Sequence, residues 1–93
     1  MAYDIEYKVT GKERISPGSL DFDDHVQDGM DTEAEAKVAA KMLEGIPGVE
    51  SLWIEVRRRP WKGLGFGDWG NWLYVATKIV GKGERWKKIQ RFR

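Results

Sequence analysis

The sequence of 93 residues contains no cysteine and only one histidine. The lack of cysteine excludes disulfide bonds, thiol catalysis and thiolate metal ligands. A single histidine is too few for a multi-histidine metal site within one chain. The longest apolar run, residues 72–76, is far too short to span a membrane, so we expect no membrane partner. The N-terminal residues lack a basic segment followed by an apolar stretch, so we expect no secretory signal and a cytoplasmic location.

The composition is that of a small globular protein, with 41% hydrophobic and 33% charged residues. A chain of this length has room for one domain, so we expect residues 1–93 to form a single small domain with a modest core. The net charge of +1 conceals an asymmetry, because residues 1–50 hold 12 acids and 5 bases whereas residues 51–93 hold 3 acids and 11 bases. The surface is therefore bipolar if the fold separates the halves, and neutralised if they interleave in one sheet.

Alternating apolar and polar residues predict three strands. Tyr3 begins such an alternation over residues 3–10, followed by a turn near Gly11, and residues 51–59 and 71–80 repeat the pattern. The acidic segment 21–31 has few strand-forming residues, so we expect an irregular connection with at most a short edge strand.

The region between the acidic segment and the second strand predicts a helix. Thr32 and Glu35 have the spacing of a capping box, and strong helix formers continue to residue 44. Gly45 is expected to end the helix in a left-handed conformation. The expected apolar stripe consists of Ala39, Met42, Leu43 and Ile46, with Ala36 and Val38 near its border.

Together these elements predict an α+β fold with one helix packed on one face of a small antiparallel sheet. The sheet is expected to have three to four strands in the order β-α-β-β, because the basic tail 82–93 can form either a fourth strand or a short C-terminal helix. The other face would carry Trp53, Trp72 and Tyr74, either exposed or covered by a second copy in a homodimer.

The most unusual segment is the loop 60–72, which is rich in glycine and tryptophan and too long for an ordinary hairpin connection. Two interpretations stay open: a recognition loop that offers its rings to a partner, or a self-packed loop that folds back over the open sheet face. Basic residues flank the loop and recur in the tail, which suits either nucleic acid or an acidic protein surface. The candidate partner-binding residues are Arg57, Arg58, Arg59, Trp61, Lys62, Phe66, Trp69, Trp72, Lys87, Lys88 and Arg91.

No catalytic or metal site is expected. The acidic segment approaches the spacing of a calcium loop that starts at Asp24, but Val26 occupies the third ligand position and Glu35 already serves the helix cap. The serines have no evident base nearby, and the carboxylates share one solvated segment instead of two contrasting environments. We therefore expect no enzyme activity and no cofactor.

The sequence favours a small non-enzymatic binding protein that uses the loop and the basic half, with nucleic acid as one partner. The alternatives are a protein–protein adaptor or inhibitor and a homo-oligomeric structural protein. In size and composition the chain is similar to accessory proteins of bacterial viruses, a likeness that rests on no motif.

Overall fold

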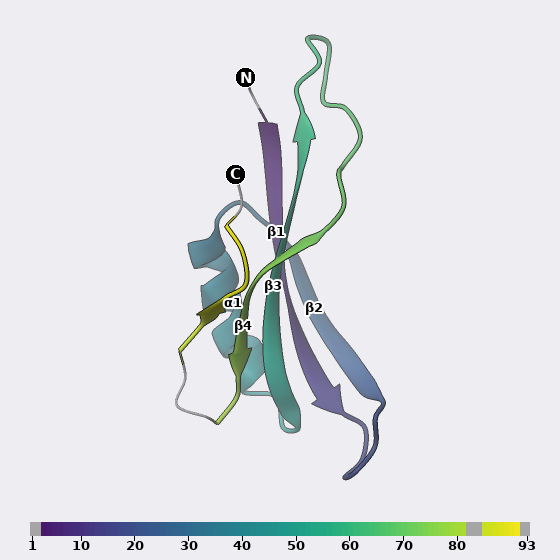
Figure 1. The fold of residues 1–93 in the computed structure, drawn as a ribbon, viewed down its shortest axis with the longest axis vertical. Helices are drawn as coiled ribbons and strands as arrows, with labels where there is room; N and C mark the ends of the chain where they lie inside the picture. Colours follow the sequence, from purple (N-terminus) through teal and green to yellow (C-terminus); the bar gives the residue numbers. More distant parts are fainter. Residues whose placement is uncertain (1–2, 82–84, 92–93) are drawn as a thin grey trace.

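The computed structural model describes residues 3–81 and 85–91, which form a curled antiparallel sheet with one helix against it (Figure 1). The elements are β1 (Tyr3–Arg14), β2 (Phe22–Met30), α1 (Glu33–Glu44), β3 (Val49–Pro60), β4 (Leu73–Ile79) and β5 (Lys87–Lys88). The strand order is β2-β1-β3-β4-β5, and every neighbouring pair is antiparallel. The α+β class and the single helix are confirmed, but the sheet has five strands where three to four were predicted.

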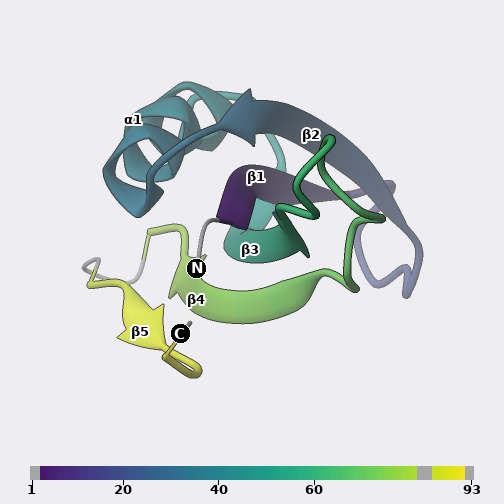
Figure 2. The ribbon, with the colours of Figure 1, turned by 90° about the horizontal axis from the view of Figure 1, so that it is seen from above.

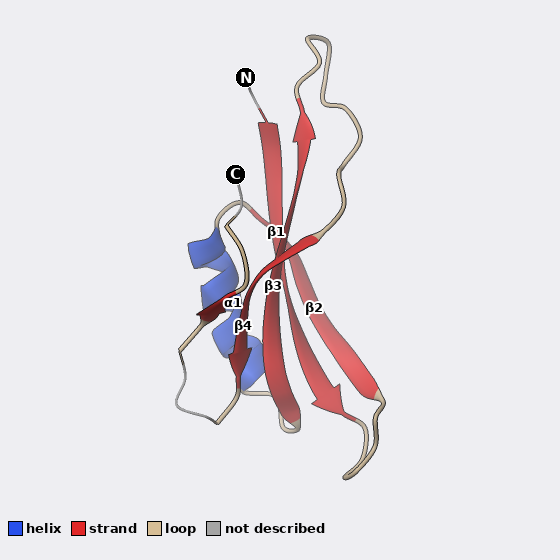
Figure 3. Ribbon diagram, viewed as in Figure 1, coloured by secondary structure: helices blue, strands red, loops and turns tan. Residues whose placement is uncertain are grey.

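Helix α1 covers one face of the sheet, and the core lies between them (Figure 3). Leu52, Ile54 and Val56 of β3 point into this layer and are fully buried. The helix contributes Ala36, Ala39, Ala40 and Leu43. The predicted stripe is therefore wrong at Met42, which is 68% exposed. Small alanines let the helix approach the sheet closely, and this tilts the buried stripe toward Ala36 and Ala40.

The sheet extends further than the sequence pattern indicated. Strand β1 continues through Gly11, where a turn was expected, because this glycine lies beneath the helix. A Cβ there would meet Leu43 Cβ and Val49 Cγ1 at 3.3 Å. The acidic segment forms the nine-residue strand β2, not an irregular connection. As an edge strand it leaves most side chains in solvent, so it needs no apolar alternation.

The helix begins as predicted and ends differently. Thr32 accepts a hydrogen bond from the Glu35 backbone N–H at 3.1 Å, which confirms the N-cap. Gly45 is right-handed, with φ −76°, and its N–H bonds to carbonyls of the last turn. Gly48, at φ +90°, makes the left-handed turn into β3 instead.

The basic tail supplies the fifth strand. Lys87 and Lys88 pair with Thr77 and Ala76 of β4, so within residues 85–91 the strand alternative is confirmed and no helix forms. The remainder of the tail, residues 82–84 and 92–93, lies outside the described residues. No helix in the described ranges is long and apolar enough to cross a membrane.

The acidic and basic halves interleave at the centre of the sheet. Strand β1 pairs with β3, which sets Glu6 against Arg57 and Asp4 against Arg59. In the central strands, the charges of the two halves of the chain therefore neutralise one another. Only the two outer strands keep the asymmetry, because β2 is acidic and β5 is basic.

Candidate functional site

The glycine- and tryptophan-rich loop projects beyond the end of the sheet and then turns back along it (Figure 1). Residues 61–66 form a small hairpin, here called the tip, closed by the hydrogen bond from Lys62 N–H to Gly65 C=O at 2.8 Å. Gly63 and Gly65 adopt positive φ angles of +87° and +156°, which L side chains rarely tolerate. Residues 67–72 form the return segment, which is tied to β3 by the bond from Gly70 N–H to Arg58 C=O at 2.8 Å.

The tip presents apolar side chains to solvent. Trp61 and Phe66 face each other edge to face, with centroids 5.1 Å apart, yet remain 46% and 43% exposed. Leu64 stands between them at the apex and is fully exposed. An exposed apolar group on a projecting hairpin is typical of a contact surface.

The return segment lies on the open face, which is the face of the sheet turned away from α1. Figure 2 looks along the molecule and shows the loop and the helix on opposite sides of the central strands. There the rings alternate with cations in a stack, here called the ring–cation ladder, whose members in order are Phe66, Arg59, Trp69, Arg57, Trp72 and Lys8. Each cation lies 4.3–4.8 Å from the neighbouring ring centroid, which is within cation–π range.

Carboxylates from β1 complete the ladder. The Arg57 guanidinium donates to Glu6 Oε1 at 2.6 and 2.8 Å, and that of Arg59 donates to Asp4 Oδ2 at 2.7 and 3.0 Å. Both arginines are therefore neutralised and stacked, and neither offers a free charge to a phosphate. Trp69 has a guanidinium at 4.4 Å and another at 4.5 Å, so its ring already has partners.

All of the predicted site residues except Arg58 fall into three groups. The ladder contains Arg57, Arg59, Trp69 and Trp72, which are partly buried and support the loop. The tip contains Trp61, Lys62 and Phe66, which are exposed, and Phe66 is also the first ring of the ladder.

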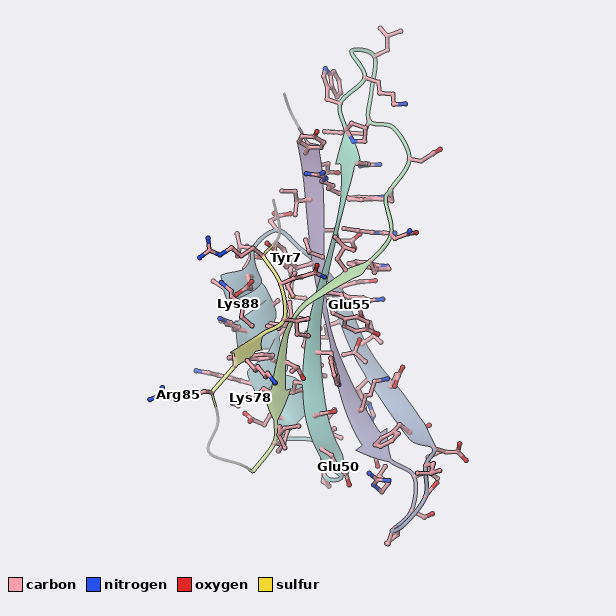
Figure 4. The ribbon with its side chains drawn as sticks, in the orientation of Figure 1. Tyr7, Glu50, Glu55, Lys78, Arg85 and Lys88 are labelled. Atoms are coloured by element: carbon pink, nitrogen blue, oxygen red, sulfur yellow. The ribbon has the colours of Figure 1, made fainter. Side chains whose placement is uncertain are left out.

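The third group lies far from the tip, beside β4 and on the helix side of the molecule (Figure 4). We call it the basic edge: the predicted Lys87, Lys88 and Arg91, together with Arg85, which the site prediction did not include. All four are exposed, and none forms an ion pair within residues 3–81 and 85–91. Arg58 belongs to none of these groups, because its guanidinium lies over the Tyr3 ring at 4.7 Å.

Sequence reasoning missed four residues of this region. Asp4, Glu6 and Lys8 build the ladder from β1, and Leu64 forms the apex of the tip. The sequence carried a signal for these residues. Asp4, Glu6 and Lys8 alternate with apolar residues, as do the polar positions of residues 51–59, and Leu64 is a large residue between two glycines.

The described chain shows no group of three or more residues that could hold a metal ion. The acidic residues of β2 are spread along the strand. His25, the single histidine, is engaged with Glu13 at 2.7 Å. No protein-family model matches the sequence, and no curated protein or solved structure is significantly similar to it.

Proposed function

We propose that the protein is a small non-enzymatic binding protein whose tip inserts into an apolar pocket on a protein partner, as an adaptor or inhibitor does. The observation that supports this most is the apex: Leu64 is fully exposed between two half-exposed rings. Side chains of this kind contribute most of the affinity when they enter a desolvated pocket.

The ladder supports a protein partner for the loop over nucleic acid. Base stacking needs free ring faces, and backbone binding needs free cations. Trp69 and Trp72 already contact guanidinium groups, and Arg57 already binds Glu6. The ladder also holds the tip in place before binding, which lowers the entropy that association must freeze.

The test is site-specific photocross-linking in the cells that make the protein. A photoreactive residue at position 64 is compared with one at Leu20, a leucine in the loop between β1 and β2 that is 90% exposed. We expect a protein adduct from position 64 only. Adducts to nucleic acid, or the same adducts from both positions, would contradict the proposal.

The affinity of the protein for the purified cross-linked partner is then measured, to test whether the tip anchors the complex. We expect Leu64→Asp and Trp61→Ala to weaken binding by about 30-fold or more, the effect typical of interface anchors, and this loss to persist at high salt. Because Leu64 contacts little of its own chain, Leu64→Asp should leave the melting temperature unchanged.

The basic edge favours a second function, binding of a nucleic-acid backbone. Four cations without an ion-pair partner in the described structure lie beside β4. We expect single-stranded oligonucleotides to bind at low salt, with affinity falling steeply as salt rises. Lys87→Glu with Lys88→Glu should abolish this binding and Leu64→Asp should not. Equal binding by both variants would exclude the basic edge.

A further inference from the structure

The open face buries two polar side chains, Glu55 and Thr10, that the tip and the basic edge do not use. They are 8% and 5% exposed. The nearest cation, Lys8 Nζ, lies 3.7 Å from Glu55 Oε1, which is beyond hydrogen-bond distance. Among the described residues, neither the Glu55 carboxylate nor the Thr10 hydroxyl has a side-chain hydrogen bond. A carboxylate buried in this way is costly unless something donates to it.

A cavity of about 180 Å³ lies over these two groups. Its remaining walls come from β1, β2, β3 and β4: Lys8, Lys12, Asp24, Val26, Trp53 and Tyr74. Figure 4 shows Glu55 at mid-length of the sheet, well away from the tip. A register shift between Ile54 and Glu55 bends the pairing of β3 with β4 at this point. Such bulges re-aim side chains and are frequent beside binding sites.

The cavity is polar but has no net charge. Lys8 and Lys12 balance Glu55 and Asp24, and Lys12 Nζ lies 3.1 Å from Asp24 Oδ1. A charged ligand would leave one of these groups uncompensated, so the site suits a neutral molecule. That molecule must donate hydrogen bonds to the carboxylate and accept them from the ammonium groups.

The aromatic wall decides the shape of the ligand. The rings of Trp53 and Tyr74 meet at 72° with centroids 5.5 Å apart, so they leave no parallel slot for a flat nucleobase. The Trp53 indole N–H donates to Ser51 Oγ at 3.0 Å, which fixes its ring. One fixed ring beside buried polar groups suits a ligand with an apolar C–H face and a polar rim.

We propose that this open-face cavity binds a neutral sugar ring. Adjacent hydroxyls would donate to the two oxygens of Glu55 and to Thr10, the ammonium of Lys8 would donate to a sugar oxygen, and the C–H face would lie on Trp53. A volume of about 180 Å³ is enough for several water molecules, which a single ring would displace. Lys8 Nζ lies 4.3 Å from the centroid of the Trp72 ring, and this contact positions the ammonium group.

The test is a titration of the ¹⁵N-labelled full chain with glucose, galactose, mannose and N-acetylglucosamine, each up to roughly 50 mM, a range that detects millimolar affinity. At least one sugar should give saturable shifts of the Trp53 indole and of the Thr10 and Glu55 amides. Glu55→Gln should weaken the binding of that sugar by at least about tenfold, the effect of losing a charge-assisted hydrogen bond. If no sugar shifts these signals, the proposal is overturned.

The matched control is Glu50→Gln, the same change on the same strand but outside the cavity, where Glu50 binds Arg14. This variant should bind sugar normally and melt at a lower temperature. Glu55→Gln should melt at nearly the same temperature, because in the described part of the chain its carboxylate accepts no side-chain hydrogen bond and its one ion pair, to Lys8 Nζ at 3.7 Å, is long. A lower melting temperature for Glu55→Gln together with unchanged sugar binding would assign Glu55 a purely structural role. Leu64→Asp should keep the sugar shifts, which separates this site from the tip.

Discussion

The two faces of the sheet are covered by different chemistry. On the helix face, aliphatic side chains such as Ile54 and Leu52 pack against the alanines of α1. On the open face, the return segment lays Trp69 and Trp72 over Arg57. Within the described residues the chain forms one helix, which covers one face of the sheet. Paired charges and rings cover the second face, and they can stay partly hydrated where an aliphatic layer cannot.

This difference makes the two layers respond to different perturbations. Burial of aliphatic groups is non-directional and roughly proportional to the apolar area removed from water, so cavities weaken it. The ladder depends on ring faces, planar guanidinium groups and their carboxylate partners, so it is sensitive to geometry and charge. Because each cation lies between two rings or beside one, loss of one member affects its neighbours.

The largest effect is expected from the helix face. Ile54→Ala should lower the free energy of unfolding by about 3 kcal/mol, because Ile54 is fully buried and its removal leaves a cavity. Urea denaturation measures this loss. The control Val38→Ala, on the exposed side of α1, should change stability by less than about 0.5 kcal/mol. Similar losses in both variants would contradict the assigned helix orientation.

A smaller effect is expected from the ladder. Trp69→Ala should lower the free energy of unfolding by about 1–2 kcal/mol, because two cation–π contacts are lost at a partly exposed site. The same denaturation assay includes Trp69→Leu, which keeps much of the apolar area without the ring face. If Trp69→Leu is as stable as the natural chain, apolar contact alone holds the return segment, and the contrast between the two faces disappears.

The smallest effect concerns an ion pair at the end of the sheet opposite the tip. The hydrogen bond from Arg14 lowers the pKa of the Glu50 carboxyl below its usual 4.5. A lowered pKa in the folded state stabilises the protein above the usual pKa, and this stabilisation is lost as the pH falls through the lowered value. The melting temperature should therefore fall as the pH drops below about 5, and it should fall less in Glu50→Gln. Identical pH profiles would show that the pair contributes nothing measurable.

The parts of the fold that the sequence predicted are those with strong local signals. The cap at Thr32 and the alternation around Ile54 are readable within a few residues, and α1 and β3 form there. Strand β2 was underestimated because an edge strand exposes both faces, so acidic residues such as Asp23 and Asp28 carry no apolar alternation. Met42 was misplaced because two stripes on α1 have similar apolar content, and only the packed sheet selects between them.

The loop was predicted as unusual, but its division into tip and ladder was not. Recognition and self-packing were offered as alternatives, whereas Trp61, Leu64 and Phe66 are exposed and Trp69 and Trp72 lie on the sheet. Which rings fold back depends on the register of β1 against β3, because that register places Glu6 opposite Arg57. Long-range pairing of this kind is not visible in a local pattern.

The segregation of charge to the outer strands gives the molecule a permanent electric dipole along the strand order. Asp23 and Asp28 lie on β2, and the basic edge lies beyond β4. A dipole of this orientation turns the β5 side of the protein toward any anionic body before contact occurs. This orienting torque acts over roughly 10 Å at 0.1 M salt and weakens as ions are added.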